Sequence, residues 1–467
     1  MCKGGDWFQM RVLVFGLGAH GGGFAAANYF LNRGDEVRVT DLRGCDVLGE
    51  TMDILENRGA TCIAGEHRME DFLWADIVIK NPAIAPDNKL LLASRTVITD
   101  FSWLFASPWC SETQIIAITG TKGKTTTAAA VSHTLNALGY ETVQCGNMGI
   151  SAFTVLADWE QRKAESRELP KYLVCEFSSW QIRDMYAALQ GDLPDIKVAA
   201  LTSLYADHQN AYKDIESYRN DKLELFGAHC ENILVPDAIL NVIRDYTRLP
   251  AKRIHSINRL AGGALPDNSP HRCAYAIGRI LGLRWRDILK ALRTFKGVPH
   301  RIEQVGVAGA IMFINDSAAT IPEAVLFSFE NCRPLPIHLI CGGTDKNLKA
   351  EGMLMALKEA SSLHLLDGSF TRNKLIPLLR QEGLFFEGPF DNMDAAVDSA
   401  YETAIQKKDP NADTVQVVML SPGAASFELF QHEFDRGDKF KIRSNQKIAG
   451  TDSSDADASD TASSPRK

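Results

Sequence analysis

The sequence has no apolar run long enough to cross a bilayer, no C-x-x-C pair of cysteines and no excess of basic residues. A membrane-spanning helix needs about 20 consecutive apolar residues, so we expect no membrane span. The ten cysteines stand singly, which argues against a structural zinc site or a disulfide framework and favours a reducing cytoplasm. A formal net charge of -8 argues against a nucleic-acid-binding surface. These absences favour a cytoplasmic protein that acts on small molecules.

What is present is an alternation of short apolar strands and helical patterns, repeated in three regions of the 467 residues. This alternation predicts an α/β fold with parallel sheets. We predict an N-terminal Rossmann-like domain over 1–107, a central P-loop ATPase-like domain over 108–298 and a C-terminal Rossmann-like domain over 299–447. Helical patterns are expected to dominate from about 213 to 295. The Ser/Asp-rich segment 448–467 lacks large apolar residues and is predicted to be a disordered acidic tail.

The first domain opens with GLGAHGGG, residues 16–23, directly after the apolar run VLVF. Glycines 16, 18 and 21 fit the dinucleotide fingerprint G-x-G-x-x-G, and Asp41 follows at the distance usual for an acid that binds a ribose hydroxyl. The fingerprint leaves two interpretations open. One is an NAD-dependent oxidoreductase, and the other is a turn of the same shape that binds a different diphosphate.

The most specific stretch is ITGTKGKTTT, residues 118–127, which follows an apolar strand and opens an alanine-rich helix that Gly139 is expected to cap. In a strand–turn–helix of this kind, backbone N–H groups and the helix dipole converge on an anion. Lys124 can reach the β- and γ-phosphates, and the Thr125 hydroxyl can bind Mg²⁺. Glu176 ends the strand YLVCE and can supply an acid beside the loop. ATP and Mg²⁺ are therefore the predicted ligands.

Nine short blocks occur in a fixed order: TGTKGKTT, GNMG, EFSSWQ, DH, Y-x-x-x-K, PHRIE, NDSAAT, GGTDKN and LSPGAASF. Over residues 11–445 this order resembles the Mur ligases, the ATP-dependent amide-forming enzymes of peptidoglycan synthesis. The last two blocks are similar to those of the D-glutamate-adding members. The resemblance implies a monomeric acid–D-amino-acid ligase whose substrates are UDP-muramoyl-alanine, D-glutamate and ATP. It also implies an acyl-phosphate intermediate.

The resemblance further implies a role for each of a set of residues. The catalytic residues are Lys124, Glu176, His208 and Lys222. The metal ligands are Thr125, Glu176, His208 and Lys222, the last as a carbamylated lysine. The ATP-binding residues are Gly120, Thr121, Lys122, Gly123, Lys124, Thr125, Thr126, Arg301 and Asp316. The residues that bind the UDP substrate are Gly16, Gly18, Ala19, His20, Asp41, Arg43, Asn147, Ser178 and Gln181. The residues that bind D-glutamate are Thr320, Lys346, Ser421 and Phe427.

The chain departs from the family pattern in two blocks. Ala318 and Ile321 stand where the familiar NDSKATN has lysine and asparagine, and Arg272 and Tyr275 stand where asparagines are usual. Two further alternatives therefore remain, a non-catalytic binding protein on the same fold and a sister ligase that adds another amino acid. The Arg-Gly-Asp sequence at 436–438 lies in a helical pattern and is interpreted as an accident of the surface sequence.

Overall fold

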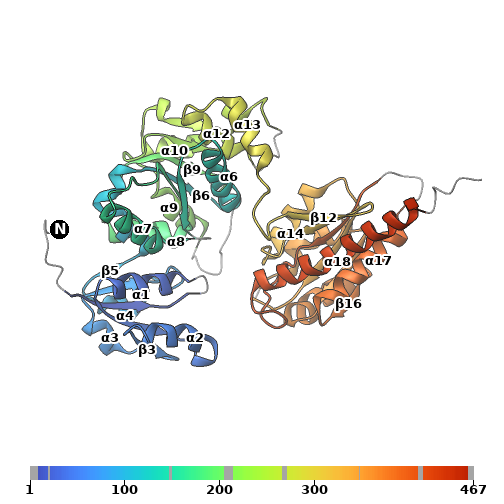
Figure 1. Ribbon diagram of the computed structural model, residues 1–467, viewed down its shortest axis with the longest axis horizontal. Helices are drawn as coiled ribbons and strands as arrows, with labels where there is room; N and C mark the ends of the chain where they lie inside the picture. Colours follow the sequence, from blue (N-terminus) through green and yellow to red (C-terminus); the bar gives the residue numbers. More distant parts are fainter. Residues whose placement is uncertain are drawn as a thin grey trace, which may run out of the picture. The chain divides into compact units, whose positions relative to one another are not determined.

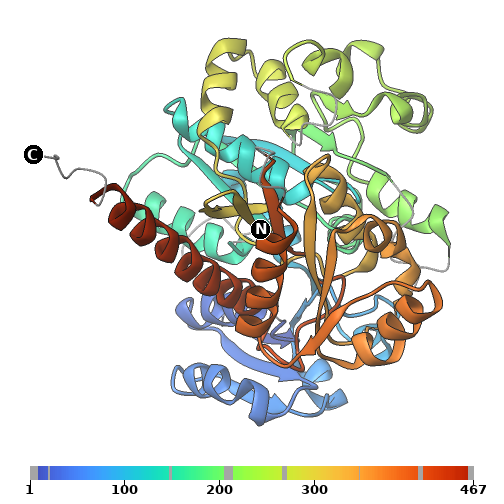
Figure 2. The same cartoon turned by 90° about the vertical axis from the view of Figure 1, so that its right-hand side faces the viewer.

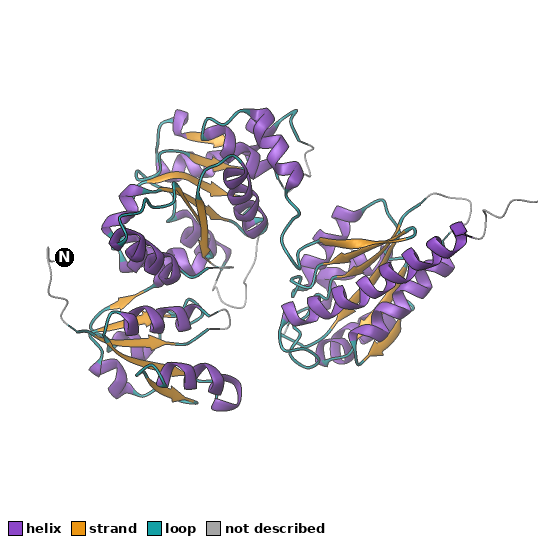
Figure 3. Cartoon of the chain, in the orientation of Figure 1, coloured by secondary structure: helices purple, strands orange, loops and turns teal. Residues whose placement is uncertain are grey.

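The structure, a computed structural model, describes residues 9–18, 21–146, 150–204, 214–265, 271–346, 348–408 and 414–460. The chain divides into two compact units, Met1–Phe295 and Lys296–Lys467 (Figure 1). The division falls close to the boundary predicted after residue 298, whereas the two domains predicted before it form one unit. The α/β prediction is confirmed, because parallel sheets flanked by helices make up both units (Figure 3).

The first sheet of the first unit has the strand order β3-β2-β1-β4-β5, with all strands parallel. Its strands are β1 (Arg11–Phe15), β2 (Glu36–Asp41), β3 (Thr61–Ala64), β4 (Ile77–Lys80) and β5 (Val97–Ile98). Its helices are α1 (Gly22–Asn32), α2 (Cys45–Glu56), α3 (Met69–Trp74), α4 (Lys89–Leu92) and α5 (Asp100–Phe105). The strand order reverses between β1 and β4, and ligands of such sheets bind beside the carboxyl ends of the strands at that point.

The second sheet of this unit has the order β11-β10-β9-β6-β8-β7 and is also parallel. Its strands are β6 (Gln114–Thr119), β7 (Thr142–Gly146), β8 (Tyr172–Glu176), β9 (Ile196–Leu201), β10 (Ile233–Val235) and β11 (Ile254–Ser256). Its α-helices are α6 (Lys124–Ala137), α7 (Ala152–Ala164), α8 (Ser179–Ala188), α9 (Ile215–Leu223), α10 (Leu240–Thr247), α11 (Ile257–Ala261), α12 (Arg272–Ile280) and α13 (Trp285–Thr294). Short 3₁₀ helices span Pro108–Glu112, Asp237–Ile239 and Ala251–Arg253. The expectation that helical patterns dominate from about 213 to 295 did not include β10 and β11, because three-residue strands are too short to show a period.

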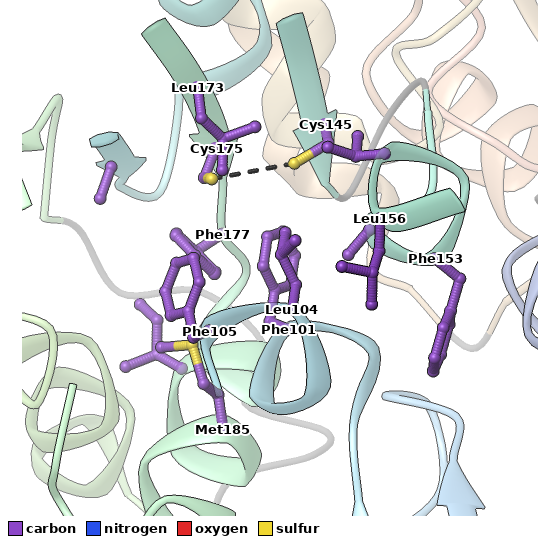
Figure 4. Close-up of a cluster of buried hydrophobic side chains, with 14 of the residues drawn as sticks. Phe101, Leu104, Phe105, Cys145, Phe153, Leu156, Leu173, Cys175, Phe177 and Met185 are labelled. Carbon is purple, nitrogen blue, oxygen red and sulfur yellow. Dashed lines mark hydrogen bonds between the residues drawn. The ribbon is translucent and has the colours of Figure 1, made fainter. Parts of the chain in front are cut away.

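Helix α5 ties the first sheet to the second through a shared hydrophobic core (Figure 4). Phe101, Leu104 and Phe105 of α5 are buried against Phe177, which follows β8, and Met185 of α8. The ring centroids of Phe101 and Phe177 lie 4.3 Å apart. The cluster continues from the first sheet into the second, and this continuity explains why two predicted domains form a single compact unit.

The second unit has one sheet of the order β12-β13-β17-β14-β15-β16, parallel except for β12, which pairs antiparallel with β13. Its strands are β12 (Glu303–Ala308), β13 (Ile311–Asn315), β14 (Ile337–Gly342), β15 (Ser362–Leu366), β16 (Glu387–Phe390) and β17 (Gln416–Leu420). Its helices are α14 (Pro322–Cys332), α15 (Leu354–Glu359), α16 (Ile376–Gln381), α17 (Met393–Lys407) and α18 (Glu433–Asp460), with single short turns of 3₁₀ helix at Ala350–Met353 and of π-helix at Thr371–Leu375. Among the described residues of the whole chain, no helix combines the length and apolarity that a bilayer span requires.

Helix α18 continues beyond residue 448, where the sequence analysis places the start of a disordered tail (Figures 1 and 2). Ile448 packs against the hydrophobic core of the second unit. Its side chain also lies directly over Gly306, where an added Cβ would be 2.5 Å from Ile448 Cδ1. Arg443 and Lys447 pair with Asp398 of the neighbouring α17. The helix runs to Asp460, past the predicted start of the tail at residue 448, and these contacts attach its part up to Ile448 to the rest of the unit. Residues 461–467 lie outside the described part of the chain.

A chain of buried polar side chains crosses the sheet of the second unit. His338 Nε2 lies 3.0 Å from Gln416 Oε1, and its Nδ1 lies 2.7 Å from Ser362 Oγ. Ser362 Oγ also lies 2.7 Å from His364 Nε2, and His364 Nδ1 lies 2.9 Å from Ser399 Oγ. Both histidines are fully buried, so charging either ring would place a cation inside the unit.

This arrangement predicts a loss of stability in mild acid. Burial lowers the pKa of His364 to about 4, with His338 and Lys407 opposing protonation in the same direction. The unfolded histidine takes up a proton near its ordinary pKa of 6.5, so the contribution is complete above that pH and declines as the pH falls toward 4. We expect the opening free energy of β15 to fall by about 2 kcal/mol between pH 7 and pH 5 from this residue alone. Hydrogen exchange of the β15 amides, corrected for intrinsic rates, measures this change, and a His364→Gln variant should flatten the pH dependence.

Candidate functional site

The phosphate-loop prediction corresponds to a tight turn between β6 and α6. Gly120 has φ +150°, and a Cβ there would lie 2.0 Å from Thr202 Oγ1, so only glycine fits this position. Gly123 has φ +83° and is the residue before the helix, and Gly139 ends the helix with φ +83° as expected. The turn therefore presents the N-terminus of a 14-residue helix, the usual backbone setting for a bound phosphate group.

Three predicted side chains meet at this turn. Lys124 Nζ donates hydrogen bonds to Gly120 O at 2.9 Å and Thr121 O at 3.3 Å. Thr125 Oγ1 donates to Glu176 Oε1 at 2.9 Å, and Glu176 is fully buried. Glu176 arrives there because β6 and β8 are adjacent parallel strands that place Ile118 opposite it. The structure thus brings the lysine, the hydroxyl and the acid to one edge of the sheet.

Lys222 approaches the loop from α9. Its Nζ donates to Gly120 O at 3.1 Å and lies 4.7 Å from the ring centroid of Tyr218, while the residue is only 1% exposed. The Tyr218 hydroxyl lies 3.1 Å from Thr121 Oγ1. A buried ammonium is costly unless polar groups surround it. The placement therefore joins Lys222 to the phosphate loop.

Two residues without a predicted role, Thr202 and Ser203, directly follow β9 and support the loop. Ser203 O accepts from Thr121 N at 2.9 Å, and Ser203 Oγ accepts from Lys122 N at 2.8 Å. Thr202 Oγ1 donates to Thr119 O at 3.2 Å and also to Lys122 O. The sequence feature that could have identified them is the pair of hydroxyl residues directly after a buried strand.

The side chains at the loop fit a magnesium nucleotide. Mg²⁺ prefers oxygen ligands and usually takes one or two from the protein and the rest from phosphates and water. Thr125 and Glu176 offer that hydroxyl and carboxylate. In the part of the chain that the structure describes, no group of three or more His, Cys, Asp and Glu could hold a metal ion by itself.

The opening glycines form the turn after β1. Gly16 and Gly18 have φ values of +85° and +73°. Leu17 N donates to Asp41 Oδ2 at 2.9 Å, and Arg43 Nη2 lies 2.7 Å from the same carboxylate oxygen. Burial raises the pKa of Asp41, but hydrogen bonds from Arg43 and Leu17 more than offset that effect and hold the pKa low. Asp41 therefore acts first as a clamp on the turn.

Ser178 and Gln181 also have a structural task. They form a capping box at the start of α8, in which Ser178 Oγ accepts from Gln181 N at 3.3 Å and Gln181 Oε1 accepts from Ser178 N at 3.0 Å. Their position directly after β8 places them two and five residues beyond Glu176 along the chain. Four further predicted residues lie outside the described part of the chain: Ala19, His20, Asn147 and His208.

In the second unit, predicted residues gather at the carboxyl ends of three neighbouring strands, β13, β17 and β14. Asp316 follows β13, and its carboxylate accepts from Ser421 Oγ at 2.8 Å and Ile302 N at 3.1 Å. Burial raises the pKa of Asp316 to about 6, and the nearby charge of Arg301 opposes this rise. The carboxyl group is almost completely buried, and its hydrogen bonds together with the charge of Arg301 limit the rise in pKa that burial causes.

The predicted D-glutamate residues lie on the loops that follow the same strands. Lys346 Nζ lies 6.0 Å from the ring centroid of Phe427, which is 64% exposed. Thr344 N donates to Ala425 O at 2.9 Å, and this bond holds the two loops side by side. Thr320 follows Ala319, whose carbonyl accepts from the N–H of Gly423 in the Ser421–Phe427 loop at 2.8 Å.

The Arg-Gly-Asp sequence is not a surface accident, and that interpretation is wrong. Arg436 is fully buried and binds both loops of the cluster: its Nε and Nη2 donate to Ser317 Oγ and O, both at 2.9 Å, and its Nη1 donates to the carbonyls of Ala424 and Ala425 at 3.1 Å. A Cβ on Gly437 would lie 2.1 Å from His300 Nδ1. The buried hydrogen bonds therefore require an arginine at 436, and the close approach of His300 requires a glycine at 437.

The departures in the helix block are internal residues. Arg272 is 6% exposed and donates to Leu265 O at 3.0 Å and Asn258 O at 3.2 Å. Tyr275 is 4% exposed and belongs to the core cluster that packs α12 against the central sheet. Both side chains therefore serve packing in this structure.

A parallel sheet with a phosphate loop, a hydroxyl–carboxylate pair and a lysine on the loop defines an enzyme of the nucleotide-triphosphate-dependent class. The sequence model of the Mur ligase middle domain matches residues 118–258. A UDP-N-acetylmuramoylalanine–D-glutamate ligase of Borreliella afzelii (strain PKo) is 30% identical, over 93% of this chain and 97% of the relative. An enzyme of the same name from Roseiflexus sp. (strain RS-1) is 31% identical, over 92% and 97%.

Among solved structures, the UDP-N-acetylmuramate-alanine ligase MurC from Thermotoga maritima is similar in fold, with a TM-score of 0.57 and 16% identity over 94% of this chain and 100% of that chain. At that identity the likeness supports the fold alone. The near full-length relatives decide the family. This chain belongs to the Mur ligase family.

Proposed function

We propose that this chain is an ATP-dependent ligase that joins D-glutamate to UDP-N-acetylmuramoyl-L-alanine in peptidoglycan synthesis. The relatives that span nearly its whole length carry that name, and this supplies the substrate class. The observation that carries the chemistry is the Thr125–Glu176 hydrogen bond beside Lys124 in the phosphate loop. Family membership also argues against the NAD-dependent interpretation of the opening glycines. We further propose a monomer that acts in the cytoplasm, where UDP-linked precursors and ATP are available.

In the first step, a carboxylate oxygen of the alanyl group attacks the γ-phosphorus of ATP in line. The bond to the β,γ-bridging oxygen breaks, giving an acyl phosphate and ADP. The backbone N–H groups at the start of α6 hold the phosphates, and the Lys124 ammonium turns from the carbonyls of Gly120 and Thr121 to the transferring group. Such preorganised positive charge is most of what a protein contributes to phosphoryl transfer.

In the second step, the amine of D-glutamate attacks the acyl carbon, and the tetrahedral intermediate loses inorganic phosphate and a proton to form the amide. Lys346 and the Phe427 ring are proposed to receive the amino acid, with Lys346 binding a carboxylate. Thr320 and Ser421 lie on the loops that would complete this subsite. That Arg301 and Asp316 bind the nucleotide stays a prediction.

Lys222 is the third side chain at the loop that we expect to act with a magnesium nucleotide. Bound Mg²⁺ would neutralise phosphate charge, with Thr125 and Glu176 as its protein ligands. We propose that Lys222 is carbamylated, which replaces its buried ammonium with an anionic group beside the loop. Reaction requires the neutral amine, which adds to the carbon of CO₂ and loses a proton. A ¹³C resonance of a carbamate after exposure to ¹³CO₂, absent from a Lys222→Arg variant, tests this proposal.

The proposed function is tested by phosphate release with the UDP substrate, ATP, Mg²⁺ and D-glutamate. We expect release with D-glutamate and none when the amino acid is omitted. L-Glutamate, glycine and L-lysine in place of D-glutamate test for a sister ligase. Absence of release with D-glutamate, or a better rate with another amino acid, would overturn the assignment.

A substitution in the first glycine turn tests whether that turn binds the UDP group. A Cβ at Gly18 would lie 2.5 Å from Asn81 Nδ2, whereas a Cβ at Gly34 would meet nothing within 4 Å. Both glycines have positive φ, +73° and +83°, so alanine strains the backbone at both sites. The clash at Gly18 costs about 1–3 kcal/mol more. We expect Gly18→Ala to raise the KM for the UDP substrate about tenfold or more relative to Gly34→Ala. Equal KM values in the two variants would contradict a role of this turn in substrate binding.

A further inference from the structure

A buried ion pair connects the first sheet to the central domain within the first unit. Lys80, the last residue of β4, places its Nζ 2.5 Å from Oδ2 of Asp184 in α8. Their side chains are only 4% and 5% exposed. Burial lowers the pKa of Lys80, and the carboxylate of Asp184 opposes that change. No motif in the sequence assigns either residue to the site.

The pair continues into a chain of alternating charges. The other carboxylate oxygen of Asp184 accepts from Arg183 Nε and Nη2, both at 3.1 Å. Arg183 Nη1 lies 3.6 Å from Asp221 Oδ2 in α9. Asp221 directly precedes Lys222. We call Lys80, Asp184, Arg183 and Asp221 the charge chain.

The charge chain begins under the glycine turn. Lys80 Nζ also donates to Asn81 O at 3.3 Å. Asn81 N donates to Phe15 O at 3.1 Å, and its side-chain amide lies 3.5 Å from Gly16 O. The Asn81 side chain fills the space that a Cβ on Gly16 or Gly18 would need. The Lys80 end of the charge chain therefore sets the position of the glycine turn that is proposed to bind the UDP group.

The charge chain ends at the phosphate loop. Asp221 lies in α9, and the residue after it in the same helix, Lys222, donates to Gly120 O. Arg183 and Asp184 lie in α8, which starts at the Ser178–Gln181 capping box. Three elements that carry proposed site residues are thus joined through charged side chains.

The charge chain is not needed merely to hold the two sheets of the first unit together. The apolar cluster around Phe101 and Phe177 already joins the two sheets. A buried ion pair adds little stability compared with well-packed apolar residues, because desolvation offsets the attraction. Directional hydrogen bonds between charged groups instead fix the position of the bonded groups relative to each other.

We propose that the charge chain is a positioning device, which holds the UDP-binding turn at a set distance from the phosphate loop. This inference rests on the proposed function. Binding energy from the UDP group can accelerate the reaction only if the bound group places the distant carboxylate correctly at ATP. A misplacement of about 1 Å can cost a factor of about 100.

The test compares the UDP substrate with the same muramoyl-alanine lacking UDP. The variants are Asp184→Asn and the double variant Lys80→Met with Asp184→Asn, whose neutral side chains keep the shape of the pair without leaving one charge unpaired. We expect the ratio of kcat/KM values for the full and truncated substrates to fall about 10- to 100-fold. The KM for ATP should stay within about twofold, since the loop itself is unchanged.

Asp76→Asn is the matched control, because it weakens the Arg11–Asp76 bridge at the surface of the same sheet, where Asp76 is 35% exposed. We expect it to leave the substrate ratio unchanged. An unchanged ratio in a folded double variant would overturn the proposal, as would an equal loss with both substrates. If the wild-type protein does not ligate D-glutamate at all, the proposed function fails instead, and the two failures are distinct.

Discussion

Lys124→Met should reduce the rate of phosphate release at least about 10³-fold while leaving the protein folded. Lys124 is the first residue of α6, and its ammonium rests on the carbonyls of Gly120 and Thr121 at the mouth of the loop. Those bonds place Nζ at the loop that is proposed to hold the phosphates. Methionine keeps the length and the apolar stem of the side chain but removes the charge that must meet the transferring group.

Stability is expected to change little in this variant, because Lys124 is only partly buried and methionine keeps the length of its side chain. Lys197→Met is the matched control. Lys197 lies in β9 of the same domain, and its Nζ pairs at the surface with Glu231, 2.7 Å away. A surface pair of this kind contributes at most about 1 kcal/mol.

Steady-state phosphate release and the Tm of each variant decide the prediction. A Lys124→Met protein that keeps more than about a tenth of the wild-type kcat would contradict the assigned role. It would also reopen the interpretation of the chain as a binding protein on a ligase fold. A low rate together with a low Tm would point to misfolding, and Lys124→Arg would then separate charge from shape.

The phosphate loop could be predicted from sequence because its determinants are local. The strand, the glycines and the Lys-Thr pair lie within about a dozen residues, and each acts through backbone geometry that neighbouring residues fix. The meeting of Thr125 and Glu176 follows from one further rule, that parallel strands end at the same edge of a sheet. The separation of the two in sequence is 51 residues, yet the topology of an α/β fold is regular enough to span it.

The rest required the three-dimensional structure. Lys80 and Asp184 are 104 residues apart, and neither has a sequence neighbourhood that distinguishes it from an ordinary surface charge. The Arg-Gly-Asp segment fits a helical pattern, but the pattern does not tell which face is covered by two loops from elsewhere in the chain. Strands β10 and β11 were missed for a different reason, since three residues carry no measurable period.

Arg436→Met should destabilise the second unit by about 3 kcal/mol or more, because a buried hydrogen-bonded network loses its central donor. The guanidinium makes four hydrogen bonds, all to neutral oxygens of residues 317, 424 and 425. Burial lowers the pKa of Arg436 to about 9, so the group stays charged at neutral pH. Its removal leaves three buried carbonyls without that donor, each at a cost of about 1 kcal/mol or more.

The conservative variant Arg436→Lys separates packing from positioning. A single ammonium cannot reach acceptors on both sides as a planar fork does. The loops that carry Thr320 and Phe427 then lose their common anchor, and the KM for D-glutamate should rise about tenfold while the KM for ATP changes little. Hydrogen exchange of the β13 and β17 amides measures the stability loss in both variants.

Arg443→Met is the control from the same helix, since Arg443 pairs with Asp398 in a partly exposed position. We expect a loss of no more than about 1 kcal/mol there. Arg436 variants no less stable than this control would contradict the network. A Lys variant with an unchanged KM for D-glutamate would show that the buried arginine supports the fold without setting the amino-acid site. The structure predicts both effects, because one side chain binds the two loops on which the D-glutamate residues are proposed to lie.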